Sequence, residues 1–203
     1  MISLLDNAIA RQSLSRIVNP VARTLINFKV TADGVTCVAA IATILAAALF
    51  IPQGKFLLAA ITIGLLALGD LLDGTIARLT NSVSKWGAFL DSTLDRVVDA
   101  AVLIAIGAFL AGFHKDHKAL IACALALVMG QMTSYIRARA EALGVNCKVG
   151  LAERAERTLV VWFALLISGL GIYCLDFAMY VLAAITTVTV GQRIWHVRKQ
   201  LTL

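Results

Sequence analysis

The segment from Gly69 to Ala100 carries five aspartates in an otherwise strongly apolar chain. Asp70 and Asp73 are three residues apart and Asp91 and Asp95 are four apart, so each pair would share one face of a helix. A carboxylate in a membrane helix costs about 2.5–3.5 kcal/mol, so such a cluster needs cations or partners. Carboxylate oxygens suit Mg²⁺ and Mn²⁺, and the spacing therefore indicates a site for one or two metal ions.

Small residues and an arginine accompany these acids. Gly74 and Ala77 follow the first acidic pair and Gly87 precedes the second, which leaves room for a ligand to approach the backbone. Arg78 can pair with a phosphate group. Together these features indicate a diphosphate site. Close helix packing remains the ordinary explanation for Gly74 or Ala77 taken alone.

Asp99 continues the spacing of the second acidic pair but lies beyond the pattern. A structural pairing with an interhelical or cytoplasmic partner explains it at least as well as a direct role does.

The elements that must position these residues are membrane helices. The chain has 203 residues, of which 60% are hydrophobic and 15% charged, and its mean hydropathy is +0.88. A bilayer core requires about 20 apolar residues per helix. The sequence therefore predicts an all-α integral membrane protein, with one catalytic domain at 31–203 built from six transmembrane helices: 33–51, 57–79, 85–112, 118–142, 156–175 and 177–196.

Residues 1–30 are expected to form a separate juxtamembrane segment. Apolar residues recur there at near-helical spacing with Arg11 and Arg16 among them, which predicts an amphipathic helix on the membrane surface. Pro20 is expected to break or kink that helix. Thr31 or Asp33 would then cap the first membrane helix. No signal peptide is expected.

The basic residues indicate an orientation in the membrane. All but three of the 18 Lys and Arg residues fall at one end of the predicted helices, and the exceptions are Lys55, Lys115 and Lys118. The positive-inside rule places both termini and the acidic segment at the cytoplasmic face of the cell membrane. The net charge of +6 is therefore explained without nucleic-acid binding.

Other residues capable of chemistry have simpler explanations. The cysteines show no C-x-x-C spacing and are predicted to be packing residues: Cys37, Cys123, Cys147 and Cys174. The histidines fall at predicted helix ends, where solvated side chains are expected: His114, His117 and His196.

The full pattern is Asp70-x-x-Asp73-Gly74-x-x-Ala77-Arg78, then eight residues, then Gly87-x-x-x-Asp91-x-x-x-Asp95. It resembles the signature of the CDP-alcohol phosphotransferases, and every fixed position is filled. The six hydrophobic segments and the amphipathic N-terminus also agree with that family, so the resemblance covers essentially the whole chain.

The resemblance implies a membrane enzyme, usually a homodimer, that displaces CMP from a CDP-linked lipid with an alcohol. It implies that two Mg²⁺ or Mn²⁺ ions are held by Asp70, Asp73, Asp91 and Asp95. The catalytic residues would be Asp91 and Asp95, with Asp95 the general base. The CDP-lipid would also contact Asp70, Asp73, Gly74, Ala77, Arg78 and Gly87. The family often has Thr-Pro-Asp/Asn before its first membrane helix; here Ala32 replaces the proline, and Thr31 and Asp33 remain expected nucleotide contacts.

The acceptor should be recognised by charges between Ser134 and Arg157. Helix salt bridges are one explanation, because Arg137 and Glu141 are four residues apart, as are Glu153 and Arg157. That explanation leaves cations without evident partners, namely Arg139, Lys148 and Arg154. An excess of cations indicates an anionic acceptor, a phosphorylated alcohol.

The segments "SYIRARAE" and "GLAERAER" and the pair Gln192–Arg193 resemble bacterial members of the family that join CDP-diacylglycerol to inositol 1-phosphate. That resemblance implies acceptor contacts from Ser134, Arg137, Arg154 and Arg193, with Arg157 and Lys148 as further candidates. Glycerol 3-phosphate is the nearest alternative acceptor.

A divalent-cation transporter would also place carboxylates on facing membrane helices. Its acids should lie near mid-membrane, whereas these flank a short turn with Arg78 and Lys85 and so lie near one surface. A scaffold or lipid-binding protein would not explain the Asp-Gly-Arg spacing. The sequence therefore favours an enzyme.

Overall fold

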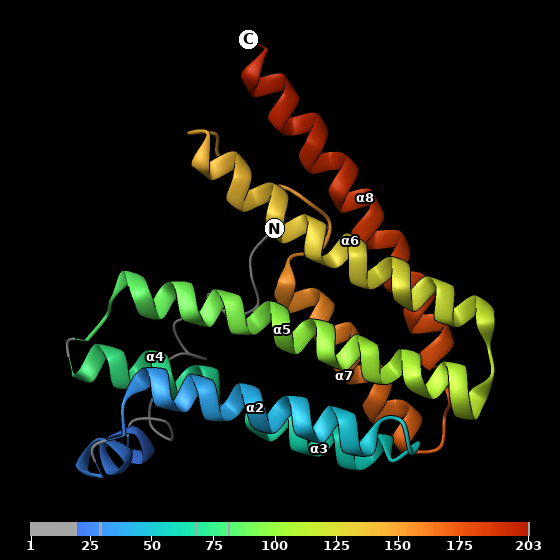
Figure 1. The fold of residues 1–203 in the computed structure, drawn as a ribbon, viewed down its shortest axis with the longest axis horizontal. Helices are drawn as coiled ribbons and strands as arrows, with labels where there is room; N and C mark the ends of the chain where they lie inside the picture. The colour runs from blue at the N-terminus through green and yellow to red at the C-terminus, as the bar shows by residue number, and fades with distance from the viewer. Residues whose placement is uncertain (1–19, 29, 68, 81, 203) are drawn as a thin grey trace. The chain divides into compact units, whose positions relative to one another are not determined.

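The computed structural model describes residues 20–28, 30–67, 69–80 and 82–202 (Figure 1). Within these ranges the chain forms helices joined by turns and contains no strand, which confirms the predicted all-helical class. Residues 20–27 are helical, and residues 1–19 and 29 of the predicted juxtamembrane segment lie outside the described part of the chain.

Four helices are long and apolar enough to cross a membrane in the described residues. They are α2 (Ala32–Phe50), α5 (Lys85–Phe109) with its π-helical continuation η1 (Leu110–His114), α6 (His117–Ala142) and α8 (Leu175–Leu201). Each begins and ends within a few residues of a predicted segment, except that α8 extends to Leu201. Long apolar runs in the sequence therefore predicted these helices correctly.

The other two predicted segments correspond to shorter helices. Instead of one helix over 57–79, the structure has α3 (Phe56–Leu66) and α4 (Gly69–Leu79), with a turn at Ala67 between them. The last of the shorter helices is α7 (Arg154–Gly169), which ends before the predicted limit at residue 175. The single helix predicted over 57–79 is wrong: the prediction extended the apolar run before Ala67 into Gly69–Leu79, which is far less apolar and forms a helix of its own.

The chain forms two compact units. The first comprises the described parts of 1–43 and 64–95, and the second comprises 44–63 and 96–203. In the first unit, α2 and α4 approach closely, because a Cβ on Gly69 would lie 2.9 Å from the Cβ of Ala39. The first unit contains the whole acidic pattern from Asp70 to Asp95, and the second contains the predicted acceptor residues.

The second unit has an apolar core built from several helices. Ile106, Leu165 and Met179 are fully buried in it. α3 and α7 pack without a side chain between them, since a Cβ on Gly169 would lie 2.3 Å from the backbone nitrogen of Leu57. Two of the four free cysteines, Cys123 and Cys147, are buried, which confirms that they are packing residues.

The turn between η1 and α6 is fixed by local contacts. Asp116 caps α6 by accepting the backbone N–H groups of Lys118 and Ala119, at 2.8 and 3.0 Å. These bonds, with that from Ala119 the larger contribution, lower the pKa of Asp116. His114 was expected to be solvated; it is exposed, but its Nε2 lies 2.9 Å from Oδ2 of Asp176.

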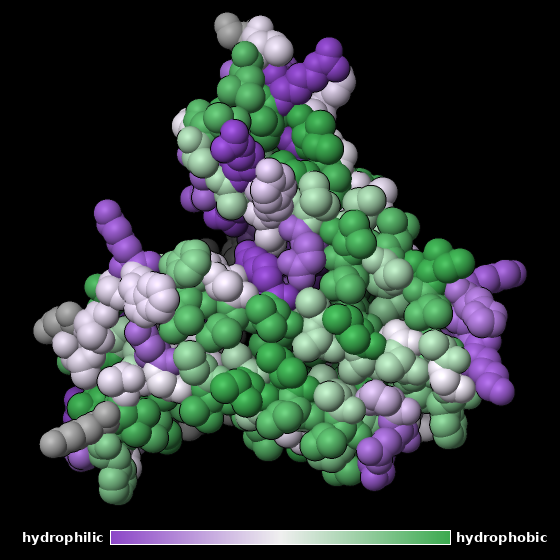
Figure 2. Space-filling view, viewed as in Figure 1, coloured by the Kyte–Doolittle hydropathy of each residue, from purple (hydrophilic) through white to green (hydrophobic). Residues whose placement is uncertain are grey.

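Large apolar side chains remain exposed along the membrane-length helices. On α2 they are Val38, Ile41, Leu45 and Leu49, which recur every three or four residues. Figure 2 shows broad areas of hydrophobic side chains on one face of the molecule. Such a surface suits contact with lipid rather than water.

Candidate active site

The site begins where α2 starts. The Thr31 hydroxyl accepts the backbone N–H of Gly34 at 3.2 Å, so Thr31 is the N-cap predicted from the sequence. Asp33 lies in the first turn of α2, and its Oδ1 is 3.4 Å from where a Cβ on Gly87 would be. The two expected CDP-site residues Asp33 and Gly87 therefore lie side by side, although they come from α2 and α5.

Asp73 is the best-defined acid of the pattern. It is 9% exposed, and its Oδ2 accepts the hydroxyl of Thr36 on α2 at 2.6 Å. Its Oδ1 accepts the backbone N–H of Gly74. These two donors fix the orientation of the carboxylate before any ligand arrives. Sequence reasoning missed Thr36, because a threonine in an apolar helix carries no distinctive signal.

Arg78 lies on the same helix as Asp73. Its Nη2 donates to the Thr75 hydroxyl at 3.1 Å, and its Nη1 is 3.4 Å from the position of a Cβ on Gly74. The guanidinium therefore rests over the bare backbone of Gly74. The small residue makes room for the cation, which is available for a phosphate at this end of α4.

The second half of the pattern lies at the start of α5. Ser84 caps this helix, because its hydroxyl accepts the N–H of Gly87 at 2.9 Å. Asp91 is exposed and Asp95 is half-buried one turn later. α4 ends at Leu79 and α5 begins at Lys85, so the connection between the two helices is short, as predicted (Figure 1).

The donor set fits a divalent metal, since carboxylate oxygens on two helices are the ligands that Mg²⁺ and Mn²⁺ take. Asp70 lies in α4, and its side chain is outside the described part of the structure. Among described side chains, Asp73, Asp91 and Asp95 do not form a group with ligand atoms all within 4.8 Å of one another; the group that does is His114, Asp116 and Asp176.

The predicted acceptor residues lie in the second unit, where Asp99 pairs with two of them. Asp99 Oδ1 is 3.5 Å from Nε of Arg154, and Asp99 Oδ2 is 3.8 Å from Nη2 of Arg157. The structural pairing expected for Asp99 is confirmed. The inference that Arg154 lacks a partner is wrong, because spacing along one helix cannot reveal a partner on another.

Thr133 connects these arginines to α8. Its hydroxyl accepts a hydrogen bond from Nη1 of Arg157 at 3.0 Å, and its backbone carbonyl accepts one from Nη1 of Arg193. Arg193 is only 3% exposed and also donates from Nε to the carbonyl of Val149 at 2.8 Å. Arg193 therefore ties the segment between α6 and α7 to α8. No pattern in the sequence singled out Thr133 as part of this network.

The remaining acceptor candidates are more accessible. Arg137 forms the salt bridge with Glu141 that its spacing predicted, at 3.0 Å. Ser134 is half-buried on α6, and Lys148 is exposed in the segment after it.

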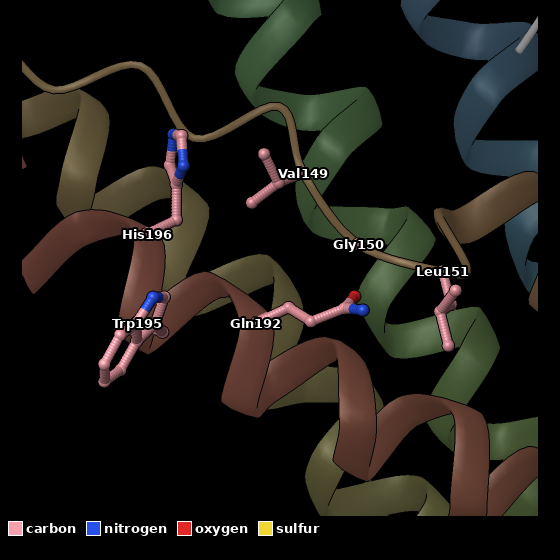
Figure 3. Close-up of a pocket in the computed structure, with 6 residues that line it drawn as sticks. All are labelled: Val149, Gly150, Leu151, Gln192, Trp195 and His196. Carbon is pink, nitrogen blue, oxygen red and sulfur yellow. The ribbon is translucent and has the colours of Figure 1, made fainter. Parts of the chain in front are cut away.

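A surface pocket of about 360 Å³ lies between that segment and α8 (Figure 3). Val149, Gly150 and Leu151 line one side and Gln192, Trp195 and His196 the other. The residues predicted to contact the acceptor are not among those that line it; Gln192, the neighbour of Arg193 in the sequence, is. The pocket therefore lies beside the arginine network rather than within it.

The sequence model of the CDP-alcohol phosphatidyltransferases matches residues 29–191, which include the entire acidic pattern. The chain therefore belongs to the CDP-alcohol phosphatidyltransferase family and is an enzyme of that class. Family membership also removes the cation transporter considered as an alternative.

Two relatives of this chain are phosphatidylinositol phosphate synthases. A phosphatidylinositol phosphate synthase of Corynebacterium glutamicum is 41% identical over 186 residues, which span 91% of this chain and 85% of the relative. The phosphatidylinositol phosphate synthase of Cutibacterium acnes is 38% identical over 199 residues, covering 93% of this chain and 96% of that protein.

Solved structures of phosphatidylinositol phosphate synthases also resemble this chain. The fold matches a crystal structure of Mycobacterium tuberculosis phosphatidylinositol phosphate synthase with CDP-DAG bound, with a TM-score of 0.86 at 34% identity, over 90% of this chain and 94% of that one. A structure of the M. tuberculosis synthase in complex with manganese and citrate gives a TM-score of 0.85 at 34% identity, over 89% and 88%.

Proposed function

We propose that this enzyme transfers the phosphatidyl group of CDP-diacylglycerol to a hydroxyl of inositol 1-phosphate, which forms phosphatidylinositol phosphate and releases CMP. The observation that carries the proposal is the likeness to phosphatidylinositol phosphate synthases over at least 90% of this chain, in the relative from C. glutamicum and in the structure with CDP-DAG. The cationic residues of the second unit support an acceptor that carries a phosphate group.

The first unit is proposed to bind the CDP end of the donor lipid. Arg78 supplies a cation over the bare backbone of Gly74, where a phosphate can approach closely. Asp33 and Gly87 form an adjacent pair suited to polar contacts with the nucleotide. Thr31 and Ala77 complete the proposed set of CDP contacts.

Four carboxylates are proposed to hold two Mg²⁺ or Mn²⁺ ions: Asp70, Asp73, Asp91 and Asp95. When bound, such ions neutralise the charge that develops on the departing CMP. Thr36 holds the Asp73 carboxylate in place through the 2.6 Å hydrogen bond. The M. tuberculosis synthase in complex with manganese supports the assignment of a divalent metal.

Asp95 is proposed to be the general base. An alcohol is a weak nucleophile, and a carboxylate within hydrogen-bond reach can take its proton as the new phosphoester bond forms. The oxygen of the alcohol then attacks the β-phosphorus of the donor, and the bond to CMP breaks.

Inositol 1-phosphate is proposed to bind in the second unit through Ser134, Arg137, Arg154 and Arg193, with Arg157 and Lys148 as further contacts. Arg193 would retain its contacts with Val149 and Thr133 and present its remaining face to the ligand. The enzyme is further proposed to be a homodimer in the cell membrane, with six membrane-crossing helices and a cytoplasmic active site.

The test is CMP release by the purified protein with CDP-diacylglycerol, Mg²⁺ or Mn²⁺ and a panel of alcohols. We expect turnover with inositol 1-phosphate and much less with glycerol 3-phosphate or free inositol. Preference for glycerol 3-phosphate would change the acceptor but not the class of reaction. Release with only unphosphorylated alcohols would contradict the proposed acceptor site.

A further inference from the structure

We propose that Asp99 is a positioning residue for the acceptor phosphate, which it serves by orienting Arg154. The inference rests on the proposed function and extends it to a residue outside the acidic pattern of the family. It starts from one carboxylate on α5 that is shared by two arginines of α7, with Oδ1 toward Arg154 and Oδ2 toward Arg157.

The two arginines are held in different ways. Arg157 is buried at 8% exposure and is also fixed by the Thr133 hydroxyl at 3.0 Å. The side chain of Arg154 is 31% exposed, and Asp99 approaches its Nε at 3.5 Å. Nε is the nitrogen nearest the aliphatic stem, and it is buried against Asp99 in an ion pair rather than a hydrogen bond. The negative charge of Asp99 therefore acts on the inner side of the guanidinium, whereas its outer edge carries paired donors of the kind that recognise phosphate.

The charges also suit a phosphate site. Asp99 carries one negative charge and shares it between the two guanidinium groups of Arg154 and Arg157. Arg193 adds a further cation that is bonded to the Thr133 carbonyl. Asp99 therefore orders the arginines without neutralising them, which lowers the conformational cost of binding an anion.

Orientation and charge predict opposite results when Asp99 is removed. If Asp99 acted only as a negative charge, the variant Asp99→Ala would bind phosphate more tightly than the wild-type protein. If Asp99 positions Arg154, the same variant binds more weakly. The direction of the change in affinity thus separates the two.

The experiment measures binding of inositol 1-phosphate and of inorganic phosphate to the full-length protein in nanodiscs by calorimetry. We expect Asp99→Ala to weaken inositol 1-phosphate binding about tenfold while the KM for CDP-diacylglycerol stays within about twofold. In an Arg154→Ala background, adding Asp99→Ala should change binding less than about twofold, because the positioned group is already gone. Asp99→Asn keeps the size and one acceptor oxygen and should give an intermediate loss, which provides the test if Asp99→Ala does not fold.

Glu156→Gln is the matched control, since it removes an exposed carboxylate from the same turn of α7 and should leave binding unchanged. Three results for Asp99→Ala would overturn the positioning role. The first is tighter binding of phosphate, and the second is an equal loss of affinity for inositol 1-phosphate and CDP-diacylglycerol. The third is the same loss of inositol 1-phosphate affinity with and without Arg154. Failure of the proposed function would show separately, as absence of CMP release by the wild-type protein whatever the binding results.

Discussion

Asp73 illustrates how single residues prepare this site. A carboxylate that is to hold a metal ion must keep its oxygens in one orientation, and an ordered neighbour does this at little cost when it comes from a rigid helix. Thr36 on α2 supplies that neighbour, at 2.6 Å from Asp73 Oδ2. The support for a metal ligand on α4 therefore depends on a residue that is 37 positions away in the chain.

Substituting Thr36 by valine tests this support. Thr36→Val keeps the side-chain shape and removes the hydroxyl donor from a buried carboxylate, so we expect Mn²⁺ binding to weaken about tenfold. Thr43→Val is the matched control, because Thr43 is also buried on α2 but its hydroxyl donates to its own helix at the Ala39 carbonyl. Titration of Mn²⁺ against both variants checks the prediction, and equal affinities would contradict it.

Substitution of Asp95 tests the general base. Asp95→Asn retains the size of the side chain but cannot accept a proton, so we expect CMP release to fall at least about 100-fold at saturating metal. Binding of CDP-diacylglycerol should remain within about threefold of wild type. Thr93→Ala on the same helix serves as the control, because the Thr93 hydroxyl is exposed and donates to its own helix at the Phe89 carbonyl. Activity retained in Asp95→Asn would exclude Asp95 as the base.

The sequence predicted some helices well and others poorly. Apolar runs located α2, α5, α6 and α8 because a long stretch of apolar side chains is itself the condition for a membrane helix. The turn at Ala67 was missed because the apolar run before it and Gly69–Leu79 were predicted as one helix, although hydropathy falls after Ala67, where Gly69 and Asp70 follow. The closeness of Arg78 to Gly74 could be predicted because it depends on spacing within one helix. The contacts of Thr36 and Thr133 could not, because their partners lie on other helices.

Packing of α3 against α7 gives a test at the level of helices. The backbones meet at Gly169, where a Cβ would lie 2.3 Å from the nitrogen of Leu57. Gly169→Ala must force the two helices apart, and we expect it to destabilise the protein by about 1–3 kcal/mol. Gly191→Ala on α8 is the control, because a Cβ there has no neighbour within 4 Å and alanine favours a helix. Thermal unfolding in detergent checks the pair; equal melting temperatures would show that α3 can move without cost.

At the scale of the whole molecule, the proposed orientation determines which substrates the enzyme can reach. Fifteen of the 18 basic residues fall at one predicted end of the helices, since only Lys55, Lys115 and Lys118 fall at the other. A cytoplasmic site would have direct access to water-soluble phosphorylated alcohols made in the cell, while the acyl chains of the donor lipid stay in the bilayer. Orientation is therefore a functional property of the molecule.

The geometry of α6 makes this orientation testable within one helix. Its 26 residues from His117 to Ala142 span about 39 Å, which exceeds the roughly 30 Å hydrocarbon core, so the helix is long enough for its two ends to lie on opposite sides. We introduce Lys118→Cys or Arg139→Cys into a protein whose four native cysteines are replaced by alanine, and treat intact cells with a membrane-impermeant maleimide. Lys118→Cys should react in intact cells, whereas Arg139→Cys should react only after the membrane is permeabilised. The reverse pattern would place the acceptor arginines outside the cell, where a phosphorylated alcohol from the cytoplasm could not reach them; labelling of both from one side would show that α6 does not cross the membrane.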